Sequence, residues 1–296
     1  MLLNKKIPAG YIFRKIKHEI LYVLIIGLLV YLLTKEFNHL LPVMPITIPT
    51  FIGTAISVIL SFKLSQSYER WWEARKIWGS IVNDSRNLII QLQSFVQNDD
   101  ETVRRIALRQ ICWSYTLGDT LRGLDPNERF KNYLSPADVE FVHQHTNKAL
   151  AILQLNAQDI AALKQREQID VFSHVQINNT IMSLTNSMGM AERIKNTVFP
   201  VTYKYFLHMI IYLFVITLSV ALRDIASYFE IPLLLVISCA FFLLEKTATH
   251  LQDPFSNRPT DTAMTTIANT IETNICELVK MPKKTQPVVS DTFYVL

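Results

Sequence analysis

The chain has 296 residues, of which 50% are hydrophobic and 18% are charged, and its formal net charge is +4. In soluble domains about a quarter of the residues are charged on average, so this composition is typical of a chain that is partly membrane-embedded and partly soluble. The small net charge, without a basic stretch interleaved with aromatic residues, argues against nucleic acid as a partner. Gly is scarce, and neither glycine-rich motif that binds nucleotide phosphates is present.

Four apolar stretches are candidates for membrane-spanning helices. In chain order they are residues 20–33, 40–62, 205–222 and 231–244. A bilayer crossing needs about 20 mostly apolar residues. The second stretch meets this requirement easily and the third nearly meets it, whereas the first and fourth are short enough to fit buried core helices as well. No Pro or Gly cluster follows the second stretch directly, so its helix is expected to continue beyond the apolar part.

Basic residues precede the first and third stretches and follow the second and fourth. They are Lys5, Lys6, Arg14, Lys15, Lys17, Lys63, Arg70, Arg75, Lys76, Arg193, Lys195, Lys204, Lys246 and Arg258. The positive-inside rule expects this distribution for an even number of crossings. The sequence therefore predicts a multi-pass protein with four transmembrane helices, with both termini and the long middle in the cytoplasm. A soluble all-α protein with a very apolar core is the alternative.

The middle of the chain is polar and has the periodicity of amphipathic helices. Ile77, Ile81 and Leu88 fall at helical spacing on one apolar face, and no strand pattern is evident. The predicted fold class is all-α, with long cytoplasmic helical extensions. The predicted divisions are 1–63 with the first two transmembrane helices, 64–199 as a cytoplasmic helical region, 200–247 with the last two transmembrane helices, and 248–296 as a cytoplasmic C-terminal helix and tail.

Two tandem tryptophans stand just beyond the second stretch. The sequence there reads Ser67-Tyr68-Glu69-Arg70-Trp71-Trp72-Glu73-Ala74-Arg75. Tryptophans beside arginine at a membrane exit fit an interfacial belt, where the amphipathic rings lie at headgroup level. The alternative is that the two indoles pack against a cytoplasmic helix. Neither interpretation is catalytic.

Three short motifs, taken in order, resemble the bestrophin family. They are Arg70-Trp71-Trp72 after the second stretch, Glu192-Arg193-Ile194 before the third, and Asp253-Pro254-Phe255 after the fourth. Each tripeptide is a weak signal, but the ordered set on four apolar stretches is specific and spans nearly the whole chain. The resemblance implies a homopentamer whose pore runs down the five-fold axis, through a membrane neck lined by the second helix and then a cytoplasmic vestibule.

The pore neck can be placed on the second helix. Thr54, Val58 and Phe62 fall at i, i+4 and i+8 and therefore share one stripe. The family carries three bulky apolar residues there, so the resemblance implies these three positions as the neck, with Thr54 making its outer end more polar. Five copies of Val58 and Phe62 would form a hydrophobic constriction, which can gate by dewetting. Without the resemblance, the stripe would be interpreted as core that packs against the first and third helices.

The resemblance also implies a second constriction, at the cytoplasmic exit. Counting back from Pro200 without a gap gives Phe172, and Ile177 is the next candidate if a gap intervenes. Animal bestrophins bind calcium through an acidic run after the Pro-Phe pair, but here Arg258 stands in that run and Asp261 is its one acidic residue. Calcium needs about six to eight oxygen ligands, carboxylates among them. We therefore expect no calcium site, no other metal and no cofactor.

Ionisable groups also lie at the edges of the apolar stretches. Glu245 directly follows the fourth stretch beside Lys246, where a helix-end role or an ion pair is the expected reading over a functional one. His208 lies within the third stretch and is expected to hydrogen-bond a neighbour. Glu192 and Arg193 are expected to pair between helices where the chain meets the membrane.

The sequence thus favours a channel for small monovalent ions in the bacterial inner membrane, with lipid and four further copies of the chain as partners. The resemblance favours chloride or other anions, but the neck carries no charge, so a cation channel for Na⁺ or K⁺ of the same architecture is the alternative. A secondary transporter would need broken spans or inverted repeats with a midplane site, and a non-conducting membrane scaffold is a third possibility. No nucleophile elbow or zinc-protease motif indicates an enzyme.

Overall fold

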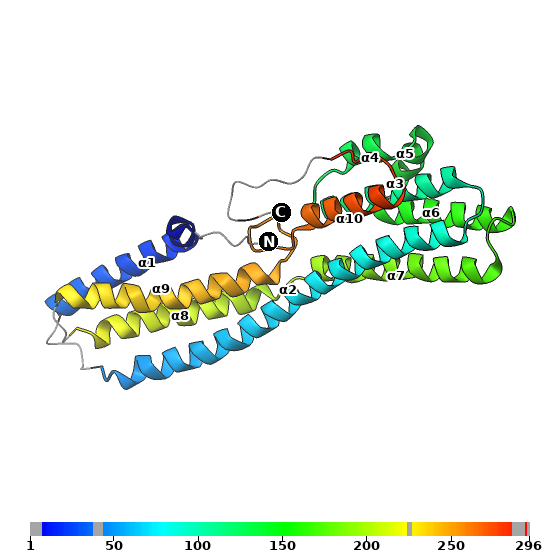
Figure 1. Cartoon of the computed structure of the whole chain (residues 1–296). Coiled ribbons are helices and arrows are strands. Elements are labelled where there is room, and N and C mark those ends of the chain that lie inside the picture. The colour runs from blue at the N-terminus through cyan, green and yellow to red at the C-terminus, as the bar shows by residue number, and fades with distance from the viewer. Residues whose placement is uncertain (1–7, 38–43, 224–226, 286–293, 295–296) are drawn as a thin grey trace. The chain divides into compact units, whose positions relative to one another are not determined.

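The computed structural model describes residues 8–37, 44–223, 227–285 and 294. All regular elements within these residues are helices (Figure 1), which confirms the predicted all-α class. In chain order they are α1 (Ala9–Glu36), α2 (Thr47–Phe95), α3 (Asp100–Arg122), α4 (Asn127–Tyr133), α5 (Pro136–His143), α6 (Lys148–Gln165), α7 (Val171–Asn196), α8 (Val201–Ala221), α9 (Ser227–Gln252) and α10 (Met264–Leu278).

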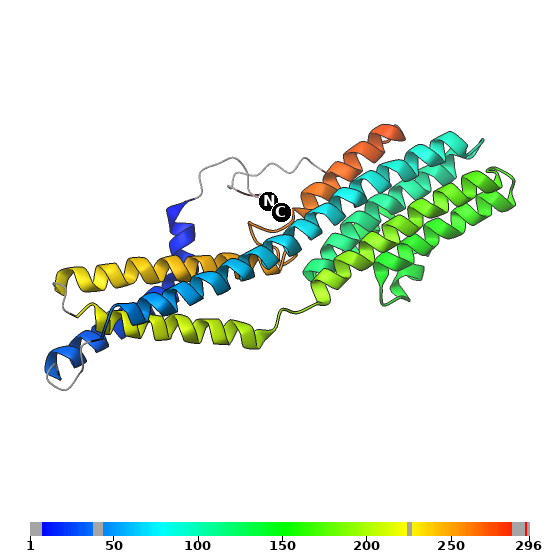
Figure 2. The same cartoon turned by 90° about the horizontal axis from the view of Figure 1, so that it is seen from below.

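The chain divides into two compact units, and each has its own core. Residues 5–70 and 198–253 form one unit, here called the membrane unit, and residues 71–197 and 254–296 belong to the other, here called the bundle unit. Helix α2 is unbroken over its 49 residues and contributes its first half to the membrane unit and its second half to the bundle unit (Figures 1 and 2). Its continuation beyond the apolar stretch was predicted from the sequence and is confirmed.

The membrane unit contains the apolar helices α1, α8 and α9 with the first half of α2. Four helices of the described chain are long and apolar enough to cross a bilayer, and α1 and α9 owe this to residues beyond the short apolar runs visible in the sequence. The buried core of this unit includes Ile16, Ile56, Leu60, Leu207 and Phe242. Much of the remaining apolar surface, such as Leu32 of α1 at 53% exposure, faces outward, as expected for a multi-pass membrane protein.

Two glycines allow close helix approach within the membrane unit. A Cβ added to Gly27 of α1 would lie 2.9 Å from Cδ2 of Leu234 on α9, and one added to Gly53 of α2 would lie 3.0 Å from Cε2 of Phe214 on α8. Small residues at such contacts let transmembrane backbones pack closely. Gly53 therefore marks the side of α2 that faces the rest of this unit.

The bundle unit packs the second half of α2 with α3, α6, α7 and α10 around the buried indoles of Trp78 and Trp113. Helix α10 runs beside the second half of α2 (Figure 2), where Nε and NH2 of Arg86 both donate to Oδ1 of Asn274, at 2.9 and 2.6 Å. The predicted division points, after residues 63, 199 and 247, mark where the chain was expected to enter or leave the membrane. The boundaries between the two compact units lie at 70/71, 197/198 and 253/254.

Candidate ion pathway and its supporting contacts

The stripe predicted as the pore neck lies on the exposed face of α2 in the membrane unit. Val58 is 52% exposed and Phe62 is 66% exposed, and Thr54 is exposed as well. The opposite face carries Ile56 and Leu60, which are buried in the core. Within the protomer the stripe is therefore not part of the core, and a large apolar surface is left available in the middle of a membrane-spanning helix.

The end of this face nearer the start of α2 presents hydroxyl oxygens. Oγ1 of Thr54 donates to the carbonyl of Thr50 at 2.9 Å, and Oγ1 of Thr50 donates to the carbonyl of Ile46 at 2.7 Å. Each hydroxyl thus donates its one hydrogen to a carbonyl of the same helix, while its oxygen keeps lone pairs that can accept a further hydrogen bond. This end of the stripe therefore presents hydrogen-bond acceptors rather than donors.

An open groove adjoins the Phe62 end of the stripe within the membrane unit. Its lining residues are Phe62, Gln66, Phe199, Pro200, Thr202, Tyr203 and Phe206, and its volume is about 480 Å³. The hydroxyl of Tyr203 reaches the carbonyl of Ile59 at 3.4 Å, so α8 begins against α2 at this level. The side chain of Phe62 is consequently bordered by aromatic residues on one side and is open on the other.

A buried polar cluster lies on the other side of α2, one residue beyond Phe62. Nζ of Lys63 donates to Oε1 of Glu245 at 2.8 Å and to Oγ1 of Thr249 at 2.9 Å, and Lys63 and Glu245 are 1% and 0% exposed. Nε2 of His208 lies 3.3 Å from Oε2 of Glu245, although the two atoms are not aligned for a hydrogen bond. Glu245 therefore forms an ion pair, as the sequence suggested, but with Lys63 of α2.

Sequence reasoning missed Lys63 as a structural residue and counted it among the flanking basic charges. The neighbouring Lys246, which stood beside Glu245 in the sequence, instead pairs with Glu19 of α1 at 2.7 Å. The phase of α2 was the available signal, because Lys63 follows Ile56 and Leu60 at helical spacing and so falls on the buried face.

The two tryptophans of the Arg-Trp-Trp motif begin the bundle unit. Their rings stack with centroids 6.2 Å apart, and Nε1 of Trp71 donates to the carbonyl of Thr260 at 2.9 Å. Trp72 is 47% exposed. Trp71 is thus held by the loop that follows Pro254-Phe255, where Phe255 is buried in the core, so parts of two of the three motifs meet in this unit. Arg70, the first residue of the motif, is half-buried at the end of the membrane unit.

The remaining motif makes contacts between helices of the bundle unit. NH2 of Arg193 binds Oε1 of Glu73 on α2 at 2.9 Å, and Oε1 of Glu192 accepts from Nδ2 of Asn147 at 2.9 Å. The two residues therefore tie α7 to different partners. The sequence alone did not identify Glu73 and Asn147 as the partners, because they lie 120 and 45 positions away along the chain.

The two candidates for the cytoplasmic aperture differ sharply in burial. Phe172 stands in the first turn of α7 and is 87% exposed, whereas Ile177 is fully buried in the core of the bundle unit. Asp170 caps the helix by accepting from the backbone N–H of Phe172 at 2.7 Å and of Ser173 at 3.0 Å. Of the two side chains, Phe172 is the one that can line an opening.

The loop after Phe255 is organised by one buried carboxyl. Oδ2 of Asp261 accepts from the backbone N–H of Arg258 at 2.9 Å, and burial raises the pKa of Asp261 above its ordinary value. No group of three or more His, Cys, Asp or Glu side chains that could hold a metal ion is found in the described parts of the chain. This carboxyl closes a turn rather than joining an acidic cluster.

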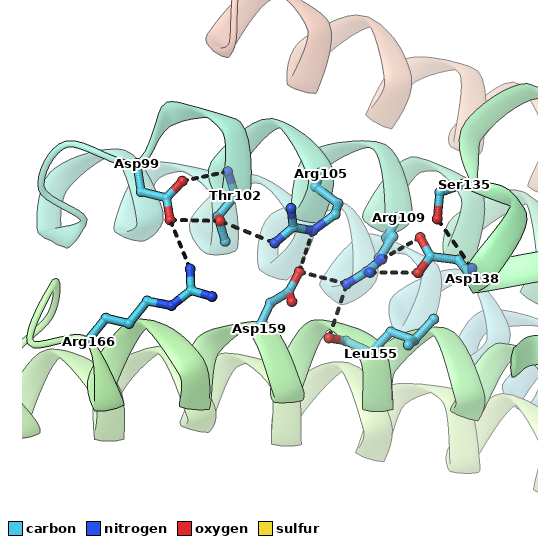
Figure 3. A network of polar contacts seen from close by, with 9 residues as sticks. All are labelled: Asp99, Thr102, Arg105, Arg109, Ser135, Asp138, Leu155, Asp159 and Arg166. Atoms are coloured by element: carbon cyan, nitrogen blue, oxygen red, sulfur yellow. Dashed lines mark hydrogen bonds and ion pairs between the residues drawn. The ribbon is translucent and has the colours of Figure 1, made fainter.

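A charged network holds α3, α5 and α6 together in the bundle unit (Figure 3). Arg109 of α3 contacts Asp138 of α5, and both Arg105 and Arg109 bind Oδ2 of Asp159 on α6 at 2.8 Å. At the start of α3, burial disfavours ionisation of Asp99, but hydrogen bonds from Thr102 and the nearby charges of two arginines lower its pKa overall.

Comparison with known proteins identifies relatives of this chain. The family model described as Bacterial/Fungal Bestrophin protein matches residues 4–277. The chain is 27% identical over 281 residues to the voltage-dependent anion channel-forming protein YneE of Escherichia coli (strain K12), which covers 94% of this chain and 92% of that protein. It is 26% identical to the voltage-dependent anion channel-forming protein RSc3414 of Ralstonia nicotianae, over 79% of this chain and 77% of the relative.

Solved structures agree with the sequence comparison. The crystal structure of a bacterial bestrophin homolog from Klebsiella pneumoniae superposes with a TM-score of 0.85 at 25% identity, covering 90% of this chain and 99% of that one. Because the family model covers most of the chain and the fold matches over nearly its full length, the chain belongs to the bestrophin family.

Proposed function

We propose that this chain forms a homopentameric channel in the bacterial inner membrane that passes small monovalent ions, with both termini in the cytoplasm. The observation that carries the proposal is the exposure of Val58 and Phe62 on a membrane-spanning helix whose other face is buried. Five copies of α2 around an axis would cover this apolar surface and leave a narrow neck of Thr54, Val58 and Phe62. Ion flow would then depend on the width and wetting of that constriction.

Phe172 would form the second constriction, where the pathway leaves the bundle unit. Its ring is almost fully exposed in the protomer, while Ile177 is enclosed by the core, so the proposal takes Phe172 over Ile177. The side chain stands on a helix end fixed by the Asp170 cap. A ring of five such phenylalanines would add a second apolar barrier.

Anions are the first candidate for the permeating ion, because curated relatives are described as voltage-dependent anion channel-forming proteins. Cations are the second candidate, and one observation favours them. The hydroxyls of Thr50 and Thr54 already donate within α2, so the outer end of the neck offers oxygen acceptors, which suit a cation better than an anion.

Reconstitution of the purified full-length protein in liposomes tests the proposal. Stepwise single-channel currents and a mass of five copies are the expected results. Slow, saturable flux would favour a transporter, and the absence of any current would favour a scaffold. A monomer in the membrane would overturn the proposal, because a single α2 cannot enclose a pathway.

A further inference from the structure

Lys63, Glu245 and Thr249 form a closed set of hydrogen bonds between α2 and α9. Nζ of Lys63 donates to Oε1 of Glu245 and to Oγ1 of Thr249, and Oγ1 of Thr249 donates to the same Oε1 at 2.7 Å. From α8, His208 faces the other oxygen of the carboxylate. The carboxylate of Glu245 thus contacts side chains from three helices, α2, α8 and α9. The charge of Lys63 is fully enclosed.

The position of this set along α2 gives it a second consequence. Successive residues of an α-helix point about 100° apart, and Lys63 directly follows Phe62. While Lys63 is bound to α9, the ring of Phe62 must point away from the core, together with Val58 one turn earlier. Gly53 lies on the same face of α2, nearer the start of the helix, and a Cβ added there would lie 3.0 Å from Cε2 of Phe214, so this face also packs closely against α8.

A rotation of α2 that turned Phe62 inward would take Lys63 away from its partners. A buried charge without its partner is strongly destabilising, and fixing a register is the best-attested use of buried ionic groups. Apolar contacts alone discriminate weakly between rotations here, because Ile, Leu, Val and Phe side chains lie on both faces of the helix. The ion pair singles out one rotation.

We infer that Lys63 is a positioning residue for the neck: bound to Glu245 and Thr249, it fixes the rotation of α2 that keeps Val58 and Phe62 on the exposed face. This inference rests on the proposed neck. It concerns a residue that lines no part of the pathway and acts through its neighbour in the sequence.

The chain offers a matched control in the same unit. Nζ of Lys246 binds Oε1 of Glu19 at 2.7 Å and joins α9 to α1. Lys246 follows Glu245 directly, but its ion pair does not include α2. Lys246→Met therefore removes an ion pair of the membrane unit without releasing the rotation of the neck helix.

Thiol accessibility measures that rotation. In the full-length protein with Cys112, Cys239 and Cys276 replaced by Ser, Phe62→Cys and Leu60→Cys are compared for their reaction rates with a water-soluble methanethiosulfonate in liposomes. Leu60 is 3% exposed, so position 62 reacts and position 60 is protected when Lys63 is present. We expect Lys63→Met to abolish this contrast, and Lys63→Arg and Lys246→Met to keep it.

If Lys63→Met fails to assemble, Lys63→Met combined with Glu245→Gln removes both charges and gives the same readout. An unchanged contrast between positions 60 and 62 in either variant would overturn the inference. The proposed function is judged separately, from the currents of the protein with native Lys63 and from those of its Val58→Ala variant. If the currents support the neck but the difference in reactivity between positions 60 and 62 does not change, only the inferred role of Lys63 is wrong.

Discussion

Arg109 of α3 binds Asp138 of α5 through two parallel hydrogen bonds, Nε to Oδ2 at 3.0 Å and NH2 to Oδ1 at 2.7 Å (Figure 3). The guanidinium also donates from NH1 to Asp159 and to the carbonyl of Leu155. Both side chains of the Arg109–Asp138 pair are less than a tenth exposed. The short helix α5 is thereby attached to the bundle unit by charge, in addition to the apolar contact of Val142, which is buried in the core.

Arg109→Ala is expected to destabilise the bundle unit by about 3–5 kcal/mol, because it leaves the Asp138 carboxylate buried without its partner. Thermal unfolding of the full-length protein in detergent measures the loss. Arg105→Ala is the control, since Arg105 is 37% exposed and an exposed ion pair contributes about 1 kcal/mol or less. Equal effects of the two variants would show that the buried pair has no special weight.

Val58→Ala and Phe62→Ala are each expected to raise single-channel conductance, because a smaller side chain widens the proposed neck and eases its wetting. Planar-bilayer recordings of the reconstituted protein measure this. Leu32→Ala trims an equally exposed apolar residue of the membrane unit, on α1, and should leave the conductance unchanged. Unaltered currents in both variants would show that these residues of α2 do not form the neck.

Phe172→Ala and Ile177→Ala should separate a role in conduction from a role in packing. Phe172→Ala is expected to change the conductance with little effect on unfolding, since its ring makes no part of the core. Ile177→Ala is expected to cost about 2–5 kcal/mol of stability, as for other large-to-small changes in a core. Paired recordings and unfolding curves decide the case. A conductance change from Ile177→Ala with intact stability would reverse the assignment.

Thr54→Val tests the sign of the permeating ion. The variant keeps the shape of the side chain and removes an oxygen acceptor from the outer end of the neck, so the relative permeability to cations should fall. Bi-ionic reversal potentials measure it. Thr217→Val is the control, because Oγ1 of Thr217 donates to the carbonyl of Leu213 on α8 in the same way at 3.0 Å. A shift of equal size in both variants would contradict a role for Thr54.

Glu272 of α10 should make the bundle unit sensitive to acid. Its buried carboxylate accepts from the hydroxyls of Tyr115 and Tyr133 and from the backbone N–H groups of Lys284 and Thr285. Burial alone would raise the pKa of Glu272, but these donors and the Thr285 hydroxyl lower it overall. Since the folded pKa lies below the unfolded one, this stabilisation is present above the unfolded pKa and is lost as the pH falls through the folded pKa.

Glu272→Gln is therefore expected to flatten the loss of stability on acidification below about pH 4, near the ordinary pKa of Glu. Unfolding midpoints measured from neutral to acidic pH give the comparison. Glu277→Gln is the control on the same helix, because Glu277 is exposed. If the two variants have the same acid limb as the unsubstituted protein, Glu272 does not control it.

Much of this architecture is readable from the sequence, because it depends on local patterns. Apolar length predicted the four membrane helices, the unbroken run after Phe62 predicted that α2 continues, and one helical stripe brought Thr54, Val58 and Phe62 onto the same face. These features follow from the 3.6-residue period and from the cost of placing polar groups in a bilayer, and both act over a few neighbouring residues.

The pairings between helices could not be obtained in that way. Lys63 and Glu245 are 182 positions apart, and the sequence favoured neither this pair nor the pair of Lys246 with Glu19 over a contact between the adjacent residues 245 and 246. Similarly, Phe172 and Ile177 are both apolar residues of α7, and their spacing does not say which one the core encloses. Tertiary packing decides these points, because a buried charge takes the partner that the neighbouring helix brings within hydrogen-bonding distance.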